Sequence, residues 1–173
     1  MVSEIKLNIP VRRIGVVSDT HIPTRARSLP KDLCTVLKGV QLILHAGDLV
    51  SDSVLDDLQV IAPVQAVSGN MDPPELRALL GRLKLVHVGS LTFGLVHGDG
   101  TRGSTLQRAV SAFAALKPSV IIFGHSHFPH NEYHADTLIF NPGSAVDPRR
   151  APGRSCGILT LKGASVRGEI IYF

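Results

Sequence analysis

The chain has 173 residues, a length that fits one domain with a sizeable hydrophobic core. Hydrophobic residues make up 44% and charged residues 18%, which excludes an intrinsically disordered chain. The formal net charge of +4 is scattered along the sequence, so a nucleic-acid partner is not predicted. No apolar run approaches the roughly 20 residues of a membrane span, and the N-terminus lacks the apolar stretch of a secretory signal. We therefore expect a cytoplasmic protein.

Short apolar runs alternate with amphipathic stretches through the first two-thirds of the chain, a pattern typical of strand–helix units. In chain order we expect strands at 14–17, 41–45, 64–67, 83–88, 91–96 and 120–123, and helices at 31–37, 52–59, 73–80 and 104–116. Ser51 is the expected N-cap of the helix at 52–59. Residues 1–12 are expected to form a loosely ordered extension.

The last third of the chain changes to strands joined by turns, which we expect at 131–135, 138–140, 157–161 and 165–171. Strand–helix units followed by a run of strands predict an α/β fold with two sheets whose outer faces are covered by helices. We expect residues 1–173 to form a single domain of this kind.

Side chains that bind metals directly follow five of the strand-like runs. They are Asp19 and His21, then Asp48, Asn70 and His97, and finally His125 and His127. Because strand carboxyl ends converge on one edge of a layered α/β fold, we expect these side chains to surround one spot. Imidazole, carboxylate and amide ligands without thiolates suit divalent ions such as Mn, Fe, Zn, Co or Ni. Seven ligands are too many for one ion and suit two ions that share a carboxylate, roughly 3.5–4 Å apart.

These blocks together resemble the calcineurin-like metallophosphoesterases, whose signature reads D-x-H, G-D, G-N, a block containing H, and G-H-x-H. The chain carries, in this order, Asp19-Thr20-His21, Gly47-Asp48, Gly69-Asn70, His97-Gly98 and Gly124-His125-Ser126-His127. More narrowly, it is similar to the small branch that includes phosphodiesterases of the YfcE type and the retromer subunit that shares their fold. The turn Asn141-Pro142-Gly143-Ser144 looks like a signature of that branch.

The resemblance covers nearly the whole chain and implies a four-layer αββα metallophosphoesterase domain. It implies one ion held by Asp19, His21, Asp48 and His127, and a second held by Asp48, Asn70, His97 and His125, with Asp48 bridging. The nucleophile would be a hydroxide that bridges the two ions, and the reaction would be hydrolysis of a small phosphoester, most readily a phosphodiester. Mn is the metal that we expect, with Fe, Zn, Co and Ni as alternatives.

Two positions depart from the pattern of the larger family members. After Gly69-Asn70 they place a His that is thought to protonate the leaving group, whereas this chain has Met71. We therefore identify no side-chain general acid, a contribution typically worth ~10²–10⁴-fold, and the change favours esters with good leaving groups. Where relatives often have a second His, this chain has Asp99, which would repel an anionic substrate or hold a water.

Other polar residues near these blocks are expected to support the ligands or to have a structural role. Asp72 is expected either to orient the ligands from behind or to cap the following helix. His45 ends a buried strand and is read as a residue of the core or of the shell behind the ligands. The remaining histidines, His87, His130 and His134, are not expected to be ligands.

The sequence leaves two classes of function open. A metal-dependent phosphodiesterase or phosphatase is the leading hypothesis, because the set of ligand residues is complete. The alternative is an interaction protein that keeps the fold with little catalysis, as the resemblance to the retromer subunit implies. The sequence does not identify the natural substrate, the physiological metal, the source of the leaving-group proton or the oligomeric state.

Overall fold

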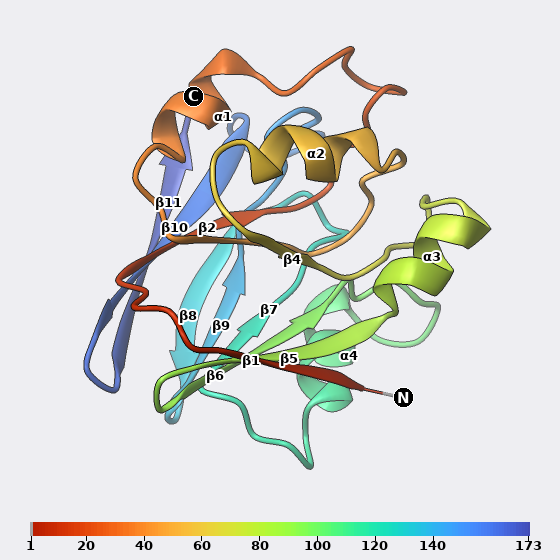
Figure 1. Ribbon diagram of the computed structural model, residues 1–173. Coiled ribbons are helices and arrows are strands. Elements are labelled where there is room, and N and C mark those ends of the chain that lie inside the picture. Colours follow the sequence, from red (N-terminus) through yellow and green to blue (C-terminus); the bar gives the residue numbers. More distant parts are fainter. Residues whose placement is uncertain (1) are drawn as a thin grey trace.

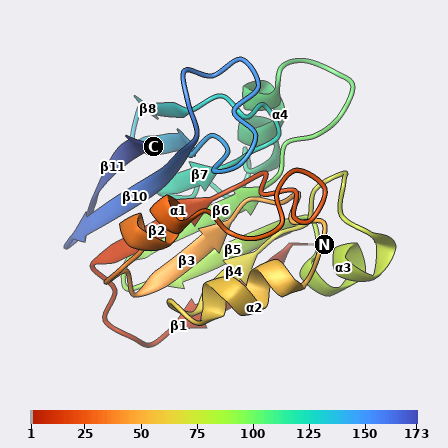
Figure 2. The same cartoon turned by 90° about the horizontal axis from the view of Figure 1, so that it is seen from above.

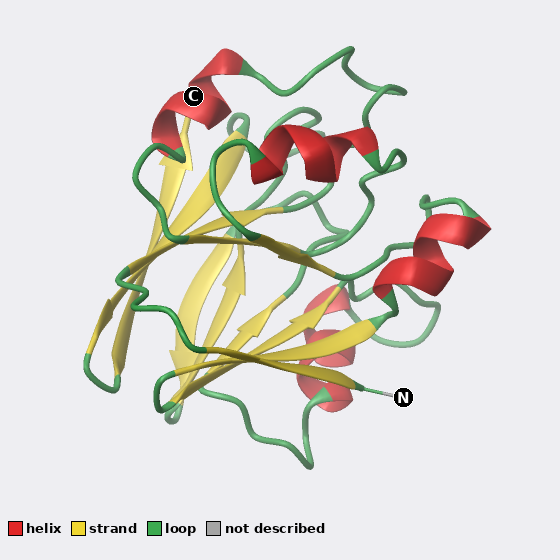
Figure 3. Cartoon of the chain, viewed as in Figure 1, coloured by secondary structure: helices red, strands yellow, loops and turns green. Residues whose placement is uncertain are grey.

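The structure is a computed structural model that describes residues 2–173. Its strands form two sheets that pack face to face, with helices on the outer sides (Figures 1 and 3). The predicted α/β sandwich flanked by helices is therefore confirmed. None of the helices within residues 2–173 is long and apolar enough to cross a membrane.

The first sheet has five strands in the order β11-β10-β2-β3-β4. They are β2 (Arg13–Val17), β3 (Leu42–His45), β4 (Val64–Ala66), β10 (Ser155–Lys162) and β11 (Ser165–Tyr172). Strands β2, β3 and β4 run parallel, while β10 is antiparallel to both of its neighbours. Helices α1 (Lys31–Val36) and α2 (Ser53–Gln59) lie over this sheet, as Figure 2 shows from above, and α3 (Pro74–Leu80) follows β4.

The second sheet has six strands in the order β1-β5-β6-β7-β9-β8. They are β1 (Ser3–Leu7), β5 (Leu83–Val88), β6 (Leu91–Val96), β7 (Val120–Ile122), β8 (His130–His134) and β9 (Thr137–Asn141). Strand β6 is parallel to β7, and β7 is parallel to β9. Helix α4 (Thr105–Ala112) covers the outer face of this sheet.

Side-chain alternation along the strands builds the hydrophobic layers. Leu42 and Leu44 of β3 are fully buried between the two sheets, whereas Ile43 points to the other face and packs under the helices. On the far side, Ile121 of β7 packs against Phe113, which follows α4. Because successive residues of a strand face opposite sides, one apolar strand contributes to two layers of core.

Three local expectations from the sequence are wrong. Residues 3–7 do not belong to a loosely ordered extension, because they form β1 and pair in parallel with β5; the first residue of that expected extension lies outside the described residues. Ser51 does not cap α2: the N-cap position is Asp52, and the Ser51 hydroxyl instead accepts the Ser53 N–H at 3.2 Å. Helix α4 does not reach Leu116: it ends at Ala112, and the next residues form turns in which the N–H groups of Phe113 and Ala114 donate to the carbonyls of Val110 and Ser111.

Within each sheet, backbone hydrogen bonds join the loops that follow neighbouring strands. The Asp19 N–H after β2 donates to the carbonyl of Gly47 after β3, at 3.0 Å. In the other sheet, the Gly124 N–H after β7 donates to the carbonyl of His97 after β6, at 3.1 Å. These loops carry most of the predicted ligands, so the fold itself aligns them.

Candidate metal centre

Two buried carboxylates, Asp19 and Asp48, form the base of the site. Each has one oxygen occupied by donors from the loops. Asp19 Oδ2 accepts the Ser18 hydroxyl at 2.7 Å and the His125 N–H at 2.9 Å, while Asp48 Oδ1 accepts the Met71 N–H at 2.8 Å. The remaining oxygen of each carboxylate faces the histidines.

The histidines are oriented by backbone carbonyls. His97 Nδ1 donates to the Ala46 carbonyl at 2.8 Å, and His127 Nδ1 donates to the Asp147 carbonyl. Because a carbonyl only accepts, Nδ1 carries a hydrogen in both rings, and Nε2 is the ring nitrogen left to bind a metal ion. A hydrogen bond of this kind from the distal nitrogen is the usual support of a histidine that binds a metal.

The free atoms fall into two overlapping groups at spacings that suit metal ligands. His127 Nε2 lies 3.3 Å from Asp19 Oδ1 and 3.2 Å from His21 Nε2. Two ligands of a tetrahedral ion with bonds near 2.0–2.1 Å are about 3.3 Å apart. In the second group, Asp48 Oδ2 lies 3.2 Å from His97 Nε2, and the same oxygen is 3.7 Å from His21 Nε2.

Buried atoms without a hydrogen bond show that this donor set fits metal ions. Among the described residues, Asp19 Oδ1 and His97 Nε2 are buried and have no hydrogen-bond partner. Such groups are costly in a protein interior unless another species satisfies them. A divalent cation satisfies both, and the groups Asp19, His21, His127 and Asp19, Asp48, His97 each bring three candidate ligand atoms within 4.8 Å of one another.

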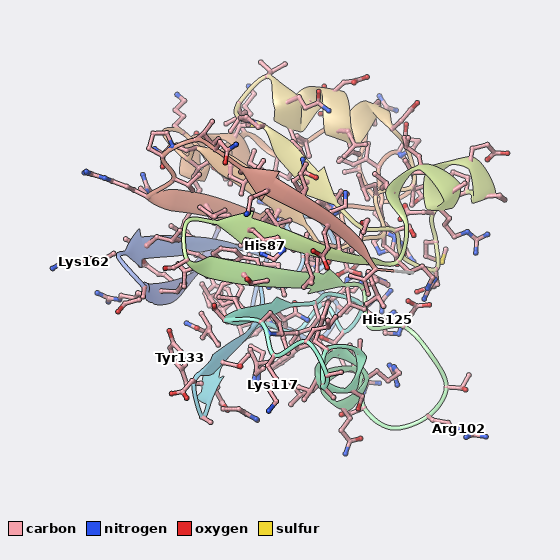
Figure 4. All side chains as sticks on the ribbon, turned by 60° about the horizontal axis from the view of Figure 1, so that its bottom comes forward. His87, Arg102, Lys117, His125, Tyr133 and Lys162 are labelled. Carbon is pink, nitrogen blue, oxygen red and sulfur yellow. The ribbon has the colours of Figure 1, made fainter. Side chains whose placement is uncertain are left out.

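Two of the predicted ligands lie at the edge of this cluster. Asn70 is exposed, and its side chain makes no hydrogen bond within residues 2–173. His125, labelled in Figure 4, is half-buried. Its ring centroid lies 5.2 Å from that of His97 in an edge-on arrangement. The structure thus brings five of the seven predicted ligands together and leaves these two beside them.

The backbone is left-handed at most of the predicted ligands. The φ angles are 53° at Asp19, 47° at His21, 58° at Asp48, 64° at His125 and 58° at His127. This conformation is uncommon in residues other than glycine, although asparagine, aspartate and histidine adopt it more often than the rest. Only four other non-glycine residues in the described chain have positive φ. This concentration indicates that the loops are shaped to aim side chains inward.

The carboxylate of Asp72 ties two ligand loops together. It accepts the N–H groups of Asp48 at 3.1 Å, of Val50 at 2.7 Å and of Gly69 at 2.7 Å. The N-cap of α3 is Pro73, and no side chain caps that helix. Of the two roles considered for Asp72, the structure therefore shows support of the ligand loops and not helix capping.

His45 connects the ligand loops that follow β2 and β3. Its Nδ1 accepts the Gly47 N–H at 3.1 Å, so its Nε2 carries the hydrogen and donates to the Thr20 hydroxyl at 3.2 Å. Burial lowers the pKa of His45 to about 3, which keeps the ring neutral and this tautomer in place.

Charge is balanced within the cluster. Burial alone would raise the pKa of the Asp19 carboxyl, but the imidazoles of His127 and His21 lower it well below its usual range. Burial alone would likewise lower the pKa of His97, but the carboxylates of Asp48 and Asp19 raise it to about 9. The metal-free site therefore holds a positive charge on an imidazole where a cation would bind.

Asp99 does not lie free beside the cleft. Its carboxylate accepts a hydrogen bond from the Arg82 guanidinium at 2.5 Å, and this ion pair lowers the pKa of Asp99 against the opposing effect of burial. The arginine neutralises the negative charge that would repel an anionic substrate.

Several residues to which the sequence assigned no role hold the ligand loops. The Ser144 hydroxyl donates to the Asp19 carbonyl at 2.7 Å, and Asn141 Nδ2 donates to the Gly124 carbonyl at 3.0 Å. The sequence feature that points to Ser144 and Asn141 is the tight turn that they form after a buried strand. Asp147 orients His127 through its carbonyl alone, so its side chain carried no signal.

We predict that Asp72→Asn destabilises the protein by about 3 kcal/mol, since hydrogen bonds to charged groups contribute about 1.5–3 kcal/mol each. The new amide has one acceptor oxygen for three N–H donors, and its NH₂ group opposes them. Urea denaturation in the presence of chelator measures the change. Asp57→Asn, at an exposed position of α2, is the matched control and should stay within about 0.5 kcal/mol of wild type. Equal stability of the two variants would contradict the role given to Asp72.

Comparison with known proteins places this geometry in a family. Residues 13–164 match the calcineurin-like phosphoesterase superfamily domain. A probable metallophosphoesterase of Methanothermobacter thermautotrophicus is 40% identical over 159 residues, which cover 91% of each chain. A probable metallophosphoesterase of Methanocaldococcus jannaschii is 38% identical over 138 residues, 79% of this chain and 69% of that protein.

Solved structures agree with this result. A Thermotoga maritima protein determined by NMR has a TM-score of 0.71 at 32% identity and covers 94% of this chain and 100% of its own. Vps29 of Chaetomium thermophilum has a TM-score of 0.77 at 23% identity over 93% of this chain and 96% of its own, a likeness that shows the fold alone. The same holds for the zinc complex of Entamoeba histolytica Vps29, with a TM-score of 0.73 at 23% identity over 92% and 98% of the two chains. On the match over residues 13–164 and the 40% identity, this chain belongs to the calcineurin-like phosphoesterase superfamily.

Proposed function

We propose that this protein is a dimetal-dependent phosphodiesterase. The observation that carries the proposal is the convergence of two buried carboxylates, each with one oxygen free of loop donors, on three imidazole nitrogens. Membership of a phosphoesterase family supports hydrolysis of a small phosphoester as the reaction.

The spacing of the free atoms supports the ligand assignment. One ion would be held by Asp19, His21, Asp48 and His127, and the other by Asp48, Asn70, His97 and His125. Asp48 Oδ2, which faces both His97 and His21, suits a bridging role. Mn is the metal that we propose, with Fe, Zn, Co and Ni as alternatives of similar ligand preference. When bound, the two ions would lower the pKa of a water and withdraw charge from the phosphoryl oxygens.

The chain's own residues determine which esters react. Met71 occupies the position after Asn70, and this residue is 55% exposed. Its N–H holds Asp48, but its thioether cannot donate a proton to a departing alkoxide. Esters whose leaving group is stable as an anion are therefore the preferred substrates.

The fold shared with Vps29 supports a second proposal, that this protein is an interaction protein with little catalysis. The two proposals differ in one measurable property. An enzyme loses turnover when one ligand is altered, whereas an interaction protein has no metal-dependent turnover to lose.

We predict that Asp48→Asn lowers the rate of hydrolysis of bis-p-nitrophenyl phosphate with Mn²⁺ by more than about 100-fold, since metal ions contribute several kcal/mol to stabilising the transition state. The amide keeps the size of the carboxylate but not its charge. Asp57→Asn is the control and should retain wild-type activity. Absence of metal-dependent turnover in the wild type, or equal turnover and metal content in Asp48→Asn, would favour the interaction protein.

We predict that Met71→His speeds the hydrolysis of a phosphodiester with a phenol leaving group, up to the ~10²-fold expected of a weak general acid. The p-nitrophenyl ester should change little, because its leaving group needs no proton. Met71→Gln, which has similar length but no acidic proton, is the control. Equal acceleration of both esters, or by both variants, would show that the substitution acts by another route.

We predict that affinity for Mn²⁺ rises with pH between about pH 7 and pH 8.5, by close to tenfold per unit if one proton is displaced. The reason is that His97, with its pKa raised to about 9 in the metal-free site, must lose a proton before it binds an ion. Calorimetry in buffers of different ionisation enthalpy measures the released proton. Affinity that does not change over this range would contradict the assignment of His97.

A further inference from the structure

A second group of potential ligands lies on β8, outside the candidate metal centre. His130, Glu132 and His134 occupy alternate positions of this strand, so their side chains share one face. One ligand atom from each lies within 4.8 Å of the other two. The sequence-based interpretation set these histidines aside because they follow the G-H-x-H block, but strand geometry brings them together.

The opposite face of β8 is anchored to the other sheet, which fixes the direction of the triad. Asn131 Nδ2 donates to the Gly168 carbonyl at 2.9 Å, and the Tyr133 hydroxyl donates to the Val166 carbonyl. Both acceptors lie on β11. The triad therefore points away from the space between the sheets, toward the side covered by α4, where the His130 ring lies 6.1 Å from that of Phe123.

The triad has the chemistry of ligands and not of an internal ion pair. Within residues 2–173, Glu132 forms no ion pair with either histidine, and His130 Nε2 is a buried atom without a hydrogen-bond partner. The rings of His130 and His134 lie edge-on with centroids 6.4 Å apart. Small side-chain rotations bring three such groups onto one ion at bond lengths near 2.0–2.2 Å.

We propose that His130, Glu132 and His134 form a surface site for one Zn²⁺, Ni²⁺ or Cu²⁺ ion, with water in the open positions. Two imidazoles and one carboxylate favour these borderline ions over Mg²⁺ or Ca²⁺, and the usual order of affinity places Mn²⁺ well below them. Figure 4 shows Tyr133, in the middle of the triad strand, well apart from His125 of the candidate metal centre. The two sites share no residue, so this proposal stands independently of the proposed function.

The position of the site gives it a structural consequence. Strand β8 is the edge of the six-stranded sheet and pairs only with β9. An ion held by residues at both ends of the strand joins them along its length and occupies its exposed face. Binding to the folded chain alone raises its stability in proportion to the logarithm of metal concentration.

The test compares full-length, untagged variants loaded with Ni²⁺ and then desalted for metal analysis. Wild type should bind one more equivalent than His134→Gln, and calorimetry should show that Glu132→Gln weakens this site by roughly 10–100-fold or more. His87→Gln, at a half-buried histidine on β5, is the control and should keep the wild-type stoichiometry. Cu²⁺ bound to the triad should show coupling to two nitrogens in its EPR spectrum, reduced to one in His134→Gln.

Equal stoichiometry and affinity in wild type, His134→Gln and Glu132→Gln would overturn the proposal. The variants should fold, because His134 and Glu132 are exposed and β8 keeps its contacts with β9 and β11; thermal unfolding in chelator checks this. Hydrolysis with Mn²⁺ should be unchanged in His134→Gln. Failure of the candidate metal centre would appear instead as absent Mn²⁺-dependent turnover in wild type, with the Ni²⁺ difference intact.

Discussion

Two carboxylates buried side by side, Asp19 and Asp48, set the constraint to which the rest of the structure responds. Charges of one sign repel strongly in a protein interior, and each loses its hydration there. The chain offsets both costs by giving the two oxygens of each carboxylate different partners. One oxygen accepts hydrogen bonds from the ligand loops, and the other faces the imidazoles and is available to a cation. Because these partners come from loops of both sheets, the loops must meet at one edge of the molecule. The alignment of the cluster therefore depends on how the two sheets pack.

Rigidity at this edge comes from hydrogen bonds that cross from loop to loop. Asp72 gathers three N–H groups on one carboxylate, and His45 links the loops after β2 and β3 as a neutral donor and acceptor. Close backbone approach adds a steric requirement, since a Cβ on Gly69 would collide with Asp48 Oδ1 and a Cβ on Gly124 would collide with the Ser18 hydroxyl. The glycines beside the ligand carboxylates are therefore explained by space, and not by a need for left-handed backbone at those two positions.

Much of the fold could be predicted because the buried strands are short β-branched runs with clear ends, and β5 and β6 match their expected bounds. Strand β1 escaped detection because its alternation of polar and apolar residues is brief, and it is stabilised only by pairing with β5, far away in sequence. In the site, residue types at strand ends indicated the ligands, but not that Asn70 would be exposed while His97 is buried. Contributions made by backbone carbonyls, such as that of Asp147, leave no trace in residue identity.

The left-handed backbone at five of the predicted ligands has a consequence for how this site can change. An asparagine or glycine tolerates that conformation at less cost than the residues now present, so replacing a ligand relaxes the loop while abolishing the ligand. A lineage that no longer needed the chemistry would thus gain stability by losing the site, one residue at a time, without disturbing either sheet.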